Sequence, residues 1–251
     1  MSPSLRFPFS STVAIAHRGA HGDGHPENSL EAVERALKLP VPGVEFDVCN
    51  LRDGEMVVSH DVRVRVGERT VSLPATSSDS LRDADREGLP PRLEPFLELV
   101  AGSDVLLNLD WKGVAHEACI GRLLSRYRLE ERTIVSSLNH RSLSSLKAEY
   151  PGVATGLSVG PLPAATRDPE RLPEEVLSRA RHSRTDAVML NKRLASEELV
   201  EAARRERTGV FFWTARDEEE YESLLGYSPD GIATDSVGQN LKSAPQLQGK
   251  R

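Results

Sequence analysis

The chain has 251 residues, a formal net charge of −6, 38% hydrophobic residues and 28% charged residues. This length is enough for one domain with a full core, and α/β barrels reach this size. The negative charge, without a long run of lysine and arginine, argues against a nucleic-acid partner. The only two cysteines, Cys49 and Cys119, lie far apart, so we expect no disulfide framework and a cytoplasmic protein. No stretch resembles a signal peptide or approaches the roughly 18 apolar residues of a membrane span, so we expect no membrane anchor.

Short apolar runs with the composition of β-strands recur along the chain. They are Thr12–Ala16, Gly43–Val48, Met56–Ser59, Val105–Trp111, Thr133–Ser137, Ala154–Val159, Ala187–Leu190, Val210–Trp213 and Gly231–Thr234. Amphipathic segments between them predict helices. These are Leu30–Leu39, Leu93–Val100, Glu117–Tyr127, His140–Tyr150, Glu174–Arg181, Ser196–Glu206 and Glu218–Leu225. Asn28 or Ser29 is expected to cap the first helix.

The alternation of strand and helix repeats about eight times, which predicts parallel strands buried on both faces. A (β/α)8 TIM barrel, an α/β fold, fits this pattern best. A doubly wound open sheet is the alternative, but no GxGxxG motif or P-loop follows the first strand. We expect residues 1–251 to form a single catalytic barrel domain with its core at about 12–241.

An insertion of about residues 55–92 is expected after the second strand. Asp53-Gly54 predicts a turn, so residues 44–60 should form a hairpin-like excursion that ends at His60-Asp61. Residues 62–90 are rich in charged side chains and lack strong periodicity. We expect them to run over the top of the barrel and to give the active site a charged roof.

Polar side chains follow most of the predicted barrel strands, and in a barrel these strand ends meet at one rim, where the active site lies. They are His17 and Arg18, Glu45 and Asp47, Asp110 and Lys112, Asn139, Asn191 and Lys192, Trp213, and Asp235. This convergence predicts one polar site built from several strands.

The residue types at this rim suit the hydrolysis of an anionic ester. Glu45 and Asp47 are two residues apart on a strand and share one face, and Asp110 should join them. Such carboxylates repel one another unless a cation lies between them, and oxygen-only ligation selects Mg²⁺ or Ca²⁺. His17 and His60 can exchange protons near neutral pH, and Arg18 can grip a phosphate. The other histidines, His21, His25, His116, His140 and His182, are interpreted as surface residues.

Several motifs carry a resemblance to a known family. They are HRG at 17–19, PENS at 26–29, EFDV at 45–48, DG at 53–54, HD at 60–61, LDWK at 109–112, FWT at 212–214 and DGIATD at 230–235. In this order and strand context they resemble the glycerophosphodiester phosphodiesterase family, over roughly residues 12–241. The resemblance implies a TIM barrel with a small insertion after the second strand, a divalent metal and hydrolysis of a phosphodiester.

The resemblance also implies roles for individual residues. His17 and His60 would be the catalytic acid and base. Glu45 and Asp47 would be metal ligands, with Glu27 as a further ligand. Arg18 would contact the phosphate, Lys112 would add positive charge, Asn28 would anchor the loop, and Trp213 would wall the pocket. Asp110 stands where the family usually has glutamate, and its shorter side chain suits a cation held through water.

The leading hypothesis is a metal-dependent phosphodiesterase that releases sn-glycerol 3-phosphate and an alcohol from a small glycerophosphodiester. A phospholipase D-like enzyme of the same fold, acting on lysophospholipids or sphingomyelin, is the alternative. A non-catalytic barrel that binds phosphodiesters is a third hypothesis, against which the intact His17 and His60 count. The charged roof predicted above favours water-soluble substrates such as glycerophosphocholine over acylated ones.

Overall fold

The structure, a computed structural model, describes residues 5–82, 88–161, 168 and 170–237. Within these residues, eight parallel strands form a closed barrel, because β1 pairs with both β2 and β11. The barrel strands are β1 (Val13–Ala16), β2 (Gly43–Asn50), β6 (Leu106–Trp111), β7 (Thr133–Ser137), β8 (Ala154–Val159), β9 (Ala187–Asn191), β10 (Gly209–Ala215) and β11 (Gly231–Thr234). The closure confirms the TIM barrel and excludes the open sheet.

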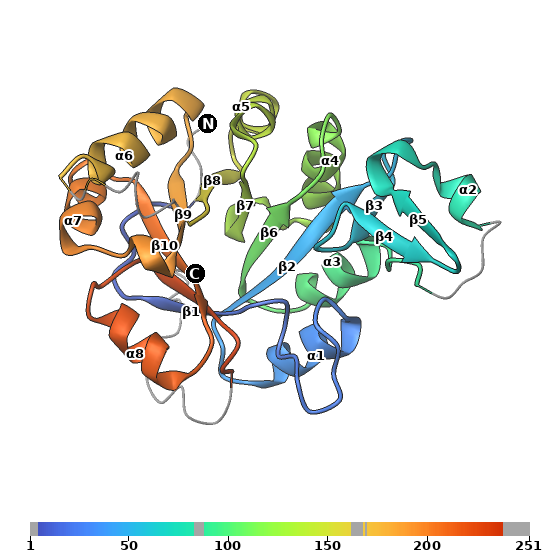
Figure 1. Ribbon diagram of the computed structural model, residues 1–251, viewed down its shortest axis with the longest axis horizontal. Helices are drawn as coiled ribbons and strands as arrows, with labels where there is room; N and C mark the ends of the chain where they lie inside the picture. The colour runs from blue at the N-terminus through green and yellow to red at the C-terminus, as the bar shows by residue number, and fades with distance from the viewer. Residues whose placement is uncertain (1–4, 83–87, 162–167, 169, 238–251) are drawn as a thin grey trace.

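Helices surround the barrel on its outer face (Figure 1). They are α1 (Leu30–Lys38), α3 (Glu94–Ala101), α4 (Glu117–Tyr127), α5 (His140–Glu149), α6 (Leu172–Ser183), α7 (Glu197–Arg205) and α8 (Glu218–Leu225). Each predicted helix is present, and α1 begins after Ser29, whose hydroxyl accepts a hydrogen bond from the N–H of Ala32 at 3.1 Å. This cap satisfies one of the free N–H groups of the first turn.

The core has two parts, one on each side of the strands. Outward-facing side chains such as Phe46 and Val48 pack against the helices, and both are fully buried. Inside the barrel, Ile15, Leu106 and Met189 belong to a separate cluster. Phe7, from the segment before β1, joins this inner cluster and contacts Phe211 edge-to-face, with ring centroids 5.8 Å apart.

Phe7 closes the end of the barrel at which the strands begin. A Cβ on Gly209, the first residue of β10, would lie 2.6 Å from the Phe7 ring. The N–H of Phe9 also donates to a carboxylate oxygen of Asp230, which directly precedes β11. The amino-terminal segment therefore plugs one end of the barrel and leaves the other end open for a site.

The insertion after β2 begins with a hairpin, as expected: β3 (Met56–Val58) pairs antiparallel with the end of β2. A second hairpin, β4 (Arg63–Val66) and β5 (Arg69–Ser72), and the short helix α2 (Ser78–Arg82) follow. These elements project from one side of the barrel beyond β2 (Figure 1). They pack on their own apolar cluster, which includes Leu51 and Leu73.

The expectation that residues 62–90 roof the barrel is wrong for the part of the insertion that the structure describes, 62–82 and 88–90. None of those residues lines the cavity at the open end of the barrel. The segment lacks strong periodicity in the sequence, and its β4–β5 hairpin and α2 were therefore not predicted. Its direction is set by the β2–β3 hairpin, which leans away from the barrel axis. Among the described helices, none is both long enough and apolar enough to cross a membrane.

Candidate active site

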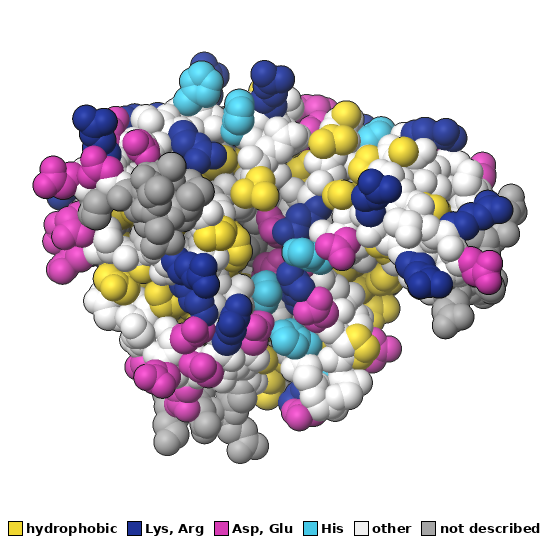
Figure 2. Space-filling model, in the orientation of Figure 1, with side chains coloured by type: hydrophobic (Ala, Val, Ile, Leu, Met, Phe, Trp, Pro, Cys, Tyr) yellow, Lys and Arg dark blue, Asp and Glu magenta, His cyan; other side chains and the backbone are white. Residues whose placement is uncertain are grey.

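A cavity of about 320 Å³ opens at the end of the barrel where the parallel strands finish. Figure 2 shows histidines, basic side chains and acidic side chains gathered around this hollow in the middle of the visible face. The cavity is lined by His17, Arg18, Glu45, Asp47, His60, Asp110, Lys112 and Trp213, together with mainly apolar or small residues from β7 to β11. Of the residues predicted to act in catalysis, to bind phosphate or metal, or to wall the pocket, only Glu27 does not line it.

Three carboxylates form the centre of the polar wall. Glu45 and Asp47 both point inward from β2, and the strand register places Asp47 directly beside Asp110 of β6. One oxygen from each carboxylate lies within 4.8 Å of the others, and Glu45 and Asp47 are only 4% and 1% exposed. Three carboxylates this close repel one another, and a hard cation with oxygen ligands would relieve the repulsion. The donor set therefore fits Mg²⁺ or Ca²⁺.

The carboxylates titrate differently because their neighbours differ. Burial, together with the charges of Asp47 and Asp110, raises the pKa of Glu45 well above its usual value. Burial also acts to raise the pKa of Asp47, but the net pKa is lowered by Lys112, Asn28 and Arg18. Without a cation, Asp47 therefore carries the more stable negative charge, and Glu45 is the carboxylate whose ionisation a bound cation would assist most.

Lys112 supplies positive charge beside this group. Its Nζ lies 3.0 Å from Oδ1 of Asp47 and also forms an ion pair with Asp110. Burial acts to lower the pKa of Lys112, but the two carboxylates outweigh it and raise the pKa above its usual value. The lysine is therefore protonated across the neutral range and available to a phosphate.

Arg18 is held by the turn that follows β1. Its backbone is left-handed, with φ at 54°, and its N–H donates to Oε2 of Glu45 at 2.8 Å. The guanidinium lies with Nε 3.0 Å from Oδ2 of Asp47 and donates from Nη1 to Oε1 of Glu27 at 2.7 Å. A left-handed arginine is uncommon, and these contacts hold it there.

Glu27 lies apart from the three clustered carboxylates. Its side chain is 52% exposed and contacts the guanidinium of Arg18. In this structure Glu27 accepts a hydrogen bond from the arginine and helps to position it. Its role as a metal ligand stays a prediction.

Asn28 anchors the loop between β1 and α1 to the site. Its Nδ2 donates to Oδ2 of Asp47 at 2.8 Å, and its Oδ1 accepts from the N–H of Asp47 at 3.0 Å. These two bonds match the anchoring role that the family resemblance implies, and they orient the carboxylate of Asp47 for its neighbours.

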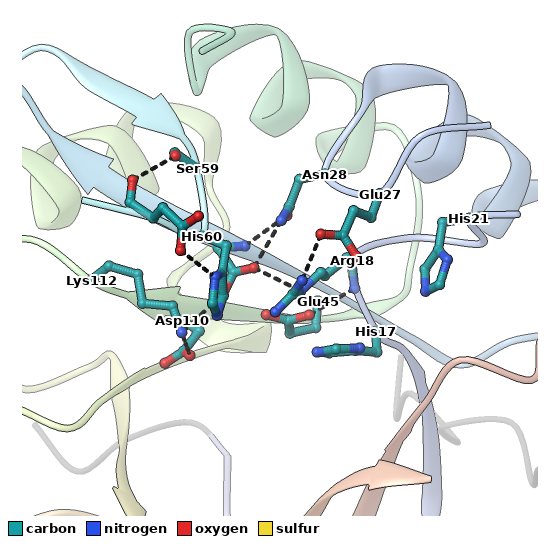
Figure 3. Close-up of polar contacts among 12 residues, drawn as sticks. His17, Arg18, His21, Glu27, Asn28, Glu45, Ser59, His60, Asp110 and Lys112 are labelled. Atoms are coloured by element: carbon teal, nitrogen blue, oxygen red, sulfur yellow. Dashed lines mark hydrogen bonds and ion pairs between the residues drawn. The ribbon is translucent and has the colours of Figure 1, made fainter. Parts of the chain in front are cut away.

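The two predicted catalytic histidines come from different elements, His17 from the end of β1 and His60 from the loop after β3 (Figure 3). Each has a carboxylate at Nδ1. Nδ1 of His17 lies 2.7 Å from Oδ1 of Asp235, and Nδ1 of His60 lies 2.9 Å from Oδ1 of Asp61. When Nδ1–H donates to the carboxylate, Nε2 keeps its lone pair and becomes the nitrogen that exchanges protons. Both side chains line the cavity.

Asp235 and His21 had no predicted role in the site. Oδ1 of Asp235 also lies 3.1 Å from Nε2 of His21, so the carboxylate contacts two histidines. The interpretation of His21 as a plain surface residue was incomplete. Closure of the barrel could have predicted the role of Asp235. Because β1 pairs with β11, Ala16 lies beside Thr234, and the residues that follow them are His17 and Asp235.

Other polar residues at the strand ends serve the framework. Oδ1 of Asn139 accepts hydrogen bonds from the first N–H groups of α5, and Asn191 does the same for the following turn. Lys192 forms an ion pair with Glu220. None of these three lines the cavity, so the rim holds both site residues and helix caps.

A known protein family matches most of this chain. The model of the glycerophosphoryl diester phosphodiesterase family matches residues 17–239. The chain belongs to this family. The protein is an enzyme, and the reaction of its family is the hydrolysis of phosphodiesters.

Relatives and solved structures of the family cover nearly the whole chain. A glycerophosphodiester phosphodiesterase of Caldanaerobacter subterraneus subsp. tengcongensis is 29% identical, over 89% of this chain and 94% of its own. A phosphodiesterase of Oleispira antarctica, solved with its product sn-glycerol-3-phosphate, has a TM-score of 0.74 and 23% identity, over 90% of this chain and 94% of its own. The glycerophosphodiester phosphodiesterase of Thermotoga maritima has a TM-score of 0.66 and 24% identity, over 92% and 97%. The two structures support the fold.

Proposed function

We propose that this enzyme hydrolyses glycerophosphodiesters to sn-glycerol 3-phosphate and an alcohol, with a divalent cation and two histidines. One observation carries the proposal. A single cavity brings together three clustered carboxylates, two cationic side chains and two histidines that each contact a carboxylate. The Oleispira antarctica phosphodiesterase, whose fold this chain shares, was solved with the same product.

Glu45, Asp47 and Asp110 are the residues proposed to hold the cation, which would be Mg²⁺ or Ca²⁺ because all three donors are oxygens. When bound, such a cation stabilises negative charge on the phosphate oxygens. Asp110 also accepts a hydrogen bond from the Ser136 hydroxyl at 3.0 Å, which orients its carboxylate toward the group. The shorter side chain of aspartate at position 110 is therefore long enough to bring its carboxylate to Glu45 and Asp47.

Arg18 and Lys112 are proposed to bind the phosphate. Both line the cavity, and each touches the carboxylate of Asp47 from a different side. The guanidinium can grip two phosphate oxygens at once, and the ammonium adds a point charge. When a phosphate binds between Arg18 and Lys112, these two side chains replace contacts with carboxylates by contacts with the phosphate oxygens.

His17 and His60 are proposed to move the protons. One imidazole takes the proton of the attacking hydroxyl, which belongs to water or to the glycerol, and a new P–O bond forms. If the glycerol hydroxyl attacks, the first product is a cyclic glycerophosphate, and a water molecule then opens this ring to give sn-glycerol 3-phosphate. The P–O bond to the departing alcohol breaks, and the other imidazole gives that alcohol a proton. The carboxylates of Asp235 and Asp61 each contact Nδ1 of their histidine and so leave Nε2 for this exchange.

The test is a direct measurement of product. The protein is incubated with glycerophosphocholine, and sn-glycerol 3-phosphate is quantified by an enzyme-coupled assay. We expect turnover, loss of turnover in EDTA, and recovery on addition of Mg²⁺ or Ca²⁺. Full activity after exhaustive dialysis against chelator would contradict the metal site, and choline phosphate as the product would contradict the bond that we propose to break.

The compartment is a separate proposal. Cys49 is buried, Cys119 is partly exposed, and both are free thiols in the structure. Free thiols are typical of a reducing compartment, which supports the cytoplasm as the place where this enzyme works.

A further inference from the structure

The cavity has two chemically different walls. The wall formed by β1, β2, β6 and the loop after β3 carries the charged residues described above. The facing wall, from β7 to β10, is mainly apolar. It includes Leu138, Pro161, Met189, Phe211 and Trp213, while the hydroxyls of Ser136, Ser158 and Thr214 interrupt it. The phosphate-binding residues account for the first wall, and the second has no part in the proposed chemistry.

The apolar wall combines a fixed part with an exposed part. The indole N–H of Trp213 donates to the carbonyl oxygen of Met189 at 3.0 Å, which holds the indole in place. Leu138, directly after β7, is 66% exposed. A large apolar side chain at the mouth of a cavity gains free energy when a ligand covers it, because apolar surface is removed from water.

Leu138 differs from the other exposed apolar side chains. Among the described residues, the exposed large hydrophobic side chains are Val62, Val114 and Leu138, and Leu138 is the member that lines the cavity. Single exposed apolar residues are normal on a protein surface. Leu138 stands out because it continues the apolar wall of Trp213 and Met189 to the entrance.

A phosphodiester has two alcohol arms, and the two walls suit different arms. The glycerol arm carries two free hydroxyls and needs polar partners, which the wall of β1, β2 and β6 supplies. With the phosphate held by Arg18 and Lys112 on that wall, the other arm extends toward the apolar wall. That wall fits an alcohol with few hydrogen-bonding groups.

We propose that the subsite for the departing alcohol is apolar, so the enzyme prefers glycerophosphodiesters whose alcohol carries a hydrocarbon chain, with Leu138, Trp213 and Met189 as the residues that bind this chain. This inference rests on the proposed function and names the substrate class of the same cavity. It replaces the charged roof as the basis for substrate choice, because the described insertion lies outside the cavity.

The test uses the glycerol 3-phosphate diesters of ethanol, butanol and hexanol. These simple alkanols differ in chain length while the reactivity of the ester is nearly constant, and the short chains do not form micelles. We expect kcat/KM to rise by about two- to fourfold for each added methylene that becomes buried. A constant kcat/KM across the series would overturn the proposal and would mean that the apolar wall packs against the glycerol carbons.

Two matched substitutions locate the subsite. Leu138→Asn should reduce the hexyl-to-ethyl ratio of kcat/KM to about one third or less of the ratio in the unsubstituted protein, because a polar amide replaces apolar contact area. Val114→Asn is the control: this valine is also exposed, at 46%, but does not line the cavity, and the ratio should stay as in the unsubstituted protein. Equal ratios in both variants would contradict the role of Leu138. Thermal melting checks that both variants are folded.

A binding experiment separates this inference from the proposed function. Ethyl, butyl and hexyl phosphate are titrated into the protein by calorimetry, and affinity should increase with chain length and lose this dependence in Leu138→Asn. If no diester releases sn-glycerol 3-phosphate while the chain-length dependence of binding is present, the proposed function fails and the apolar subsite stands. If turnover occurs but neither kcat/KM nor affinity depends on chain length, the subsite fails alone.

Discussion

At the scale of single residues, the site depends on histidines that are oriented by carboxylates. We expect His17→Ala and His60→Ala each to lower kcat by about 10²–10⁴-fold, the usual contribution of a positioned acid or base. Steady-state release of sn-glycerol 3-phosphate measures the effect, and circular dichroism checks the fold. His140→Ala is the control, because this histidine is exposed and absent from the cavity. Near-normal turnover in either site variant would remove that histidine from the mechanism.

A second residue-scale prediction concerns Glu45, whose pKa is raised by burial and by Asp47 and Asp110. A carboxyl with a raised pKa contributes stability below its unfolded pKa and loses that contribution as the pH rises through the folded pKa. Ionisation of Glu45 therefore costs the metal-free fold stability as the pH rises. Glu45→Gln should increase metal-free stability by about 1 kcal/mol, or roughly 2–4 °C in Tm.

The same variant should lose the effect of metal on stability. In the unsubstituted protein, Mg²⁺ or Ca²⁺ at about 100 times its Kd should stabilise by about 2.7 kcal/mol. With Gln at position 45 the thermal shift should shrink or vanish, because a neutral amide is a poorer ligand for a hard cation. A lower metal-free Tm in Glu45→Gln would contradict this prediction, because it would mean that the carboxylate at position 45 stabilises the metal-free fold.

At the scale of elements, the turn between β1 and α1 sets the position of Arg18. Gly19 has φ at +79°, and a Cβ there would lie 2.7 Å from the backbone carbon of Ala32 in α1. Gly19→Ala should destabilise the fold by about 1–3 kcal/mol and reduce activity, because the helix must move away from the strand end. Urea unfolding and kcat measure the two effects.

The control for this turn is a second glycine with the same backbone requirement and open space around it. Gly22 has φ at +91°, and a Cβ there would meet no atom of the described residues within 4 Å beyond its own chain neighbours. Gly22→Ala therefore tests the left-handed backbone alone, and we expect it to cost about 1 kcal/mol and to keep activity. Similar losses in the two variants would mean that the contact between Gly19 and α1 is unimportant.

At the scale of the whole molecule, the barrel needs a plug at the end opposite to the site. Phe7 is 8% exposed and packs against Phe211 and the start of β10. Phe7→Ala should lower the free energy of unfolding by about 3 kcal/mol through lost burial and the cavity left behind. The KM for glycerophosphocholine should hardly change. A loss under about 1 kcal/mol would show that the amino-terminal segment is not part of the core.

The sequence by itself determined the order, type and approximate ends of the barrel strands, of β3 and of the helices α1 and α3 to α8, because hydrophobic periodicity, caps and turns are local properties. It did not predict β4, β5 and α2, which lie in the segment without strong periodicity. It also determined which side chains stand at strand ends: Glu45, Asp47 and Asp110 were predicted to converge, and they lie within 4.8 Å of one another. Strand alternation and the parallel fold are sufficient for that inference.

Only the tertiary structure decided the contacts that join distant parts of the chain. His17 and Asp235 are 218 positions apart, and their pairing depends on closure of the barrel by β1 and β11. The direction of the insertion and the apolar wall that includes Leu138 likewise follow from packing between separate elements. A local pattern gives the face that a side chain takes on its own strand, but its neighbours on other strands are chosen by register and closure, which are properties of the whole barrel.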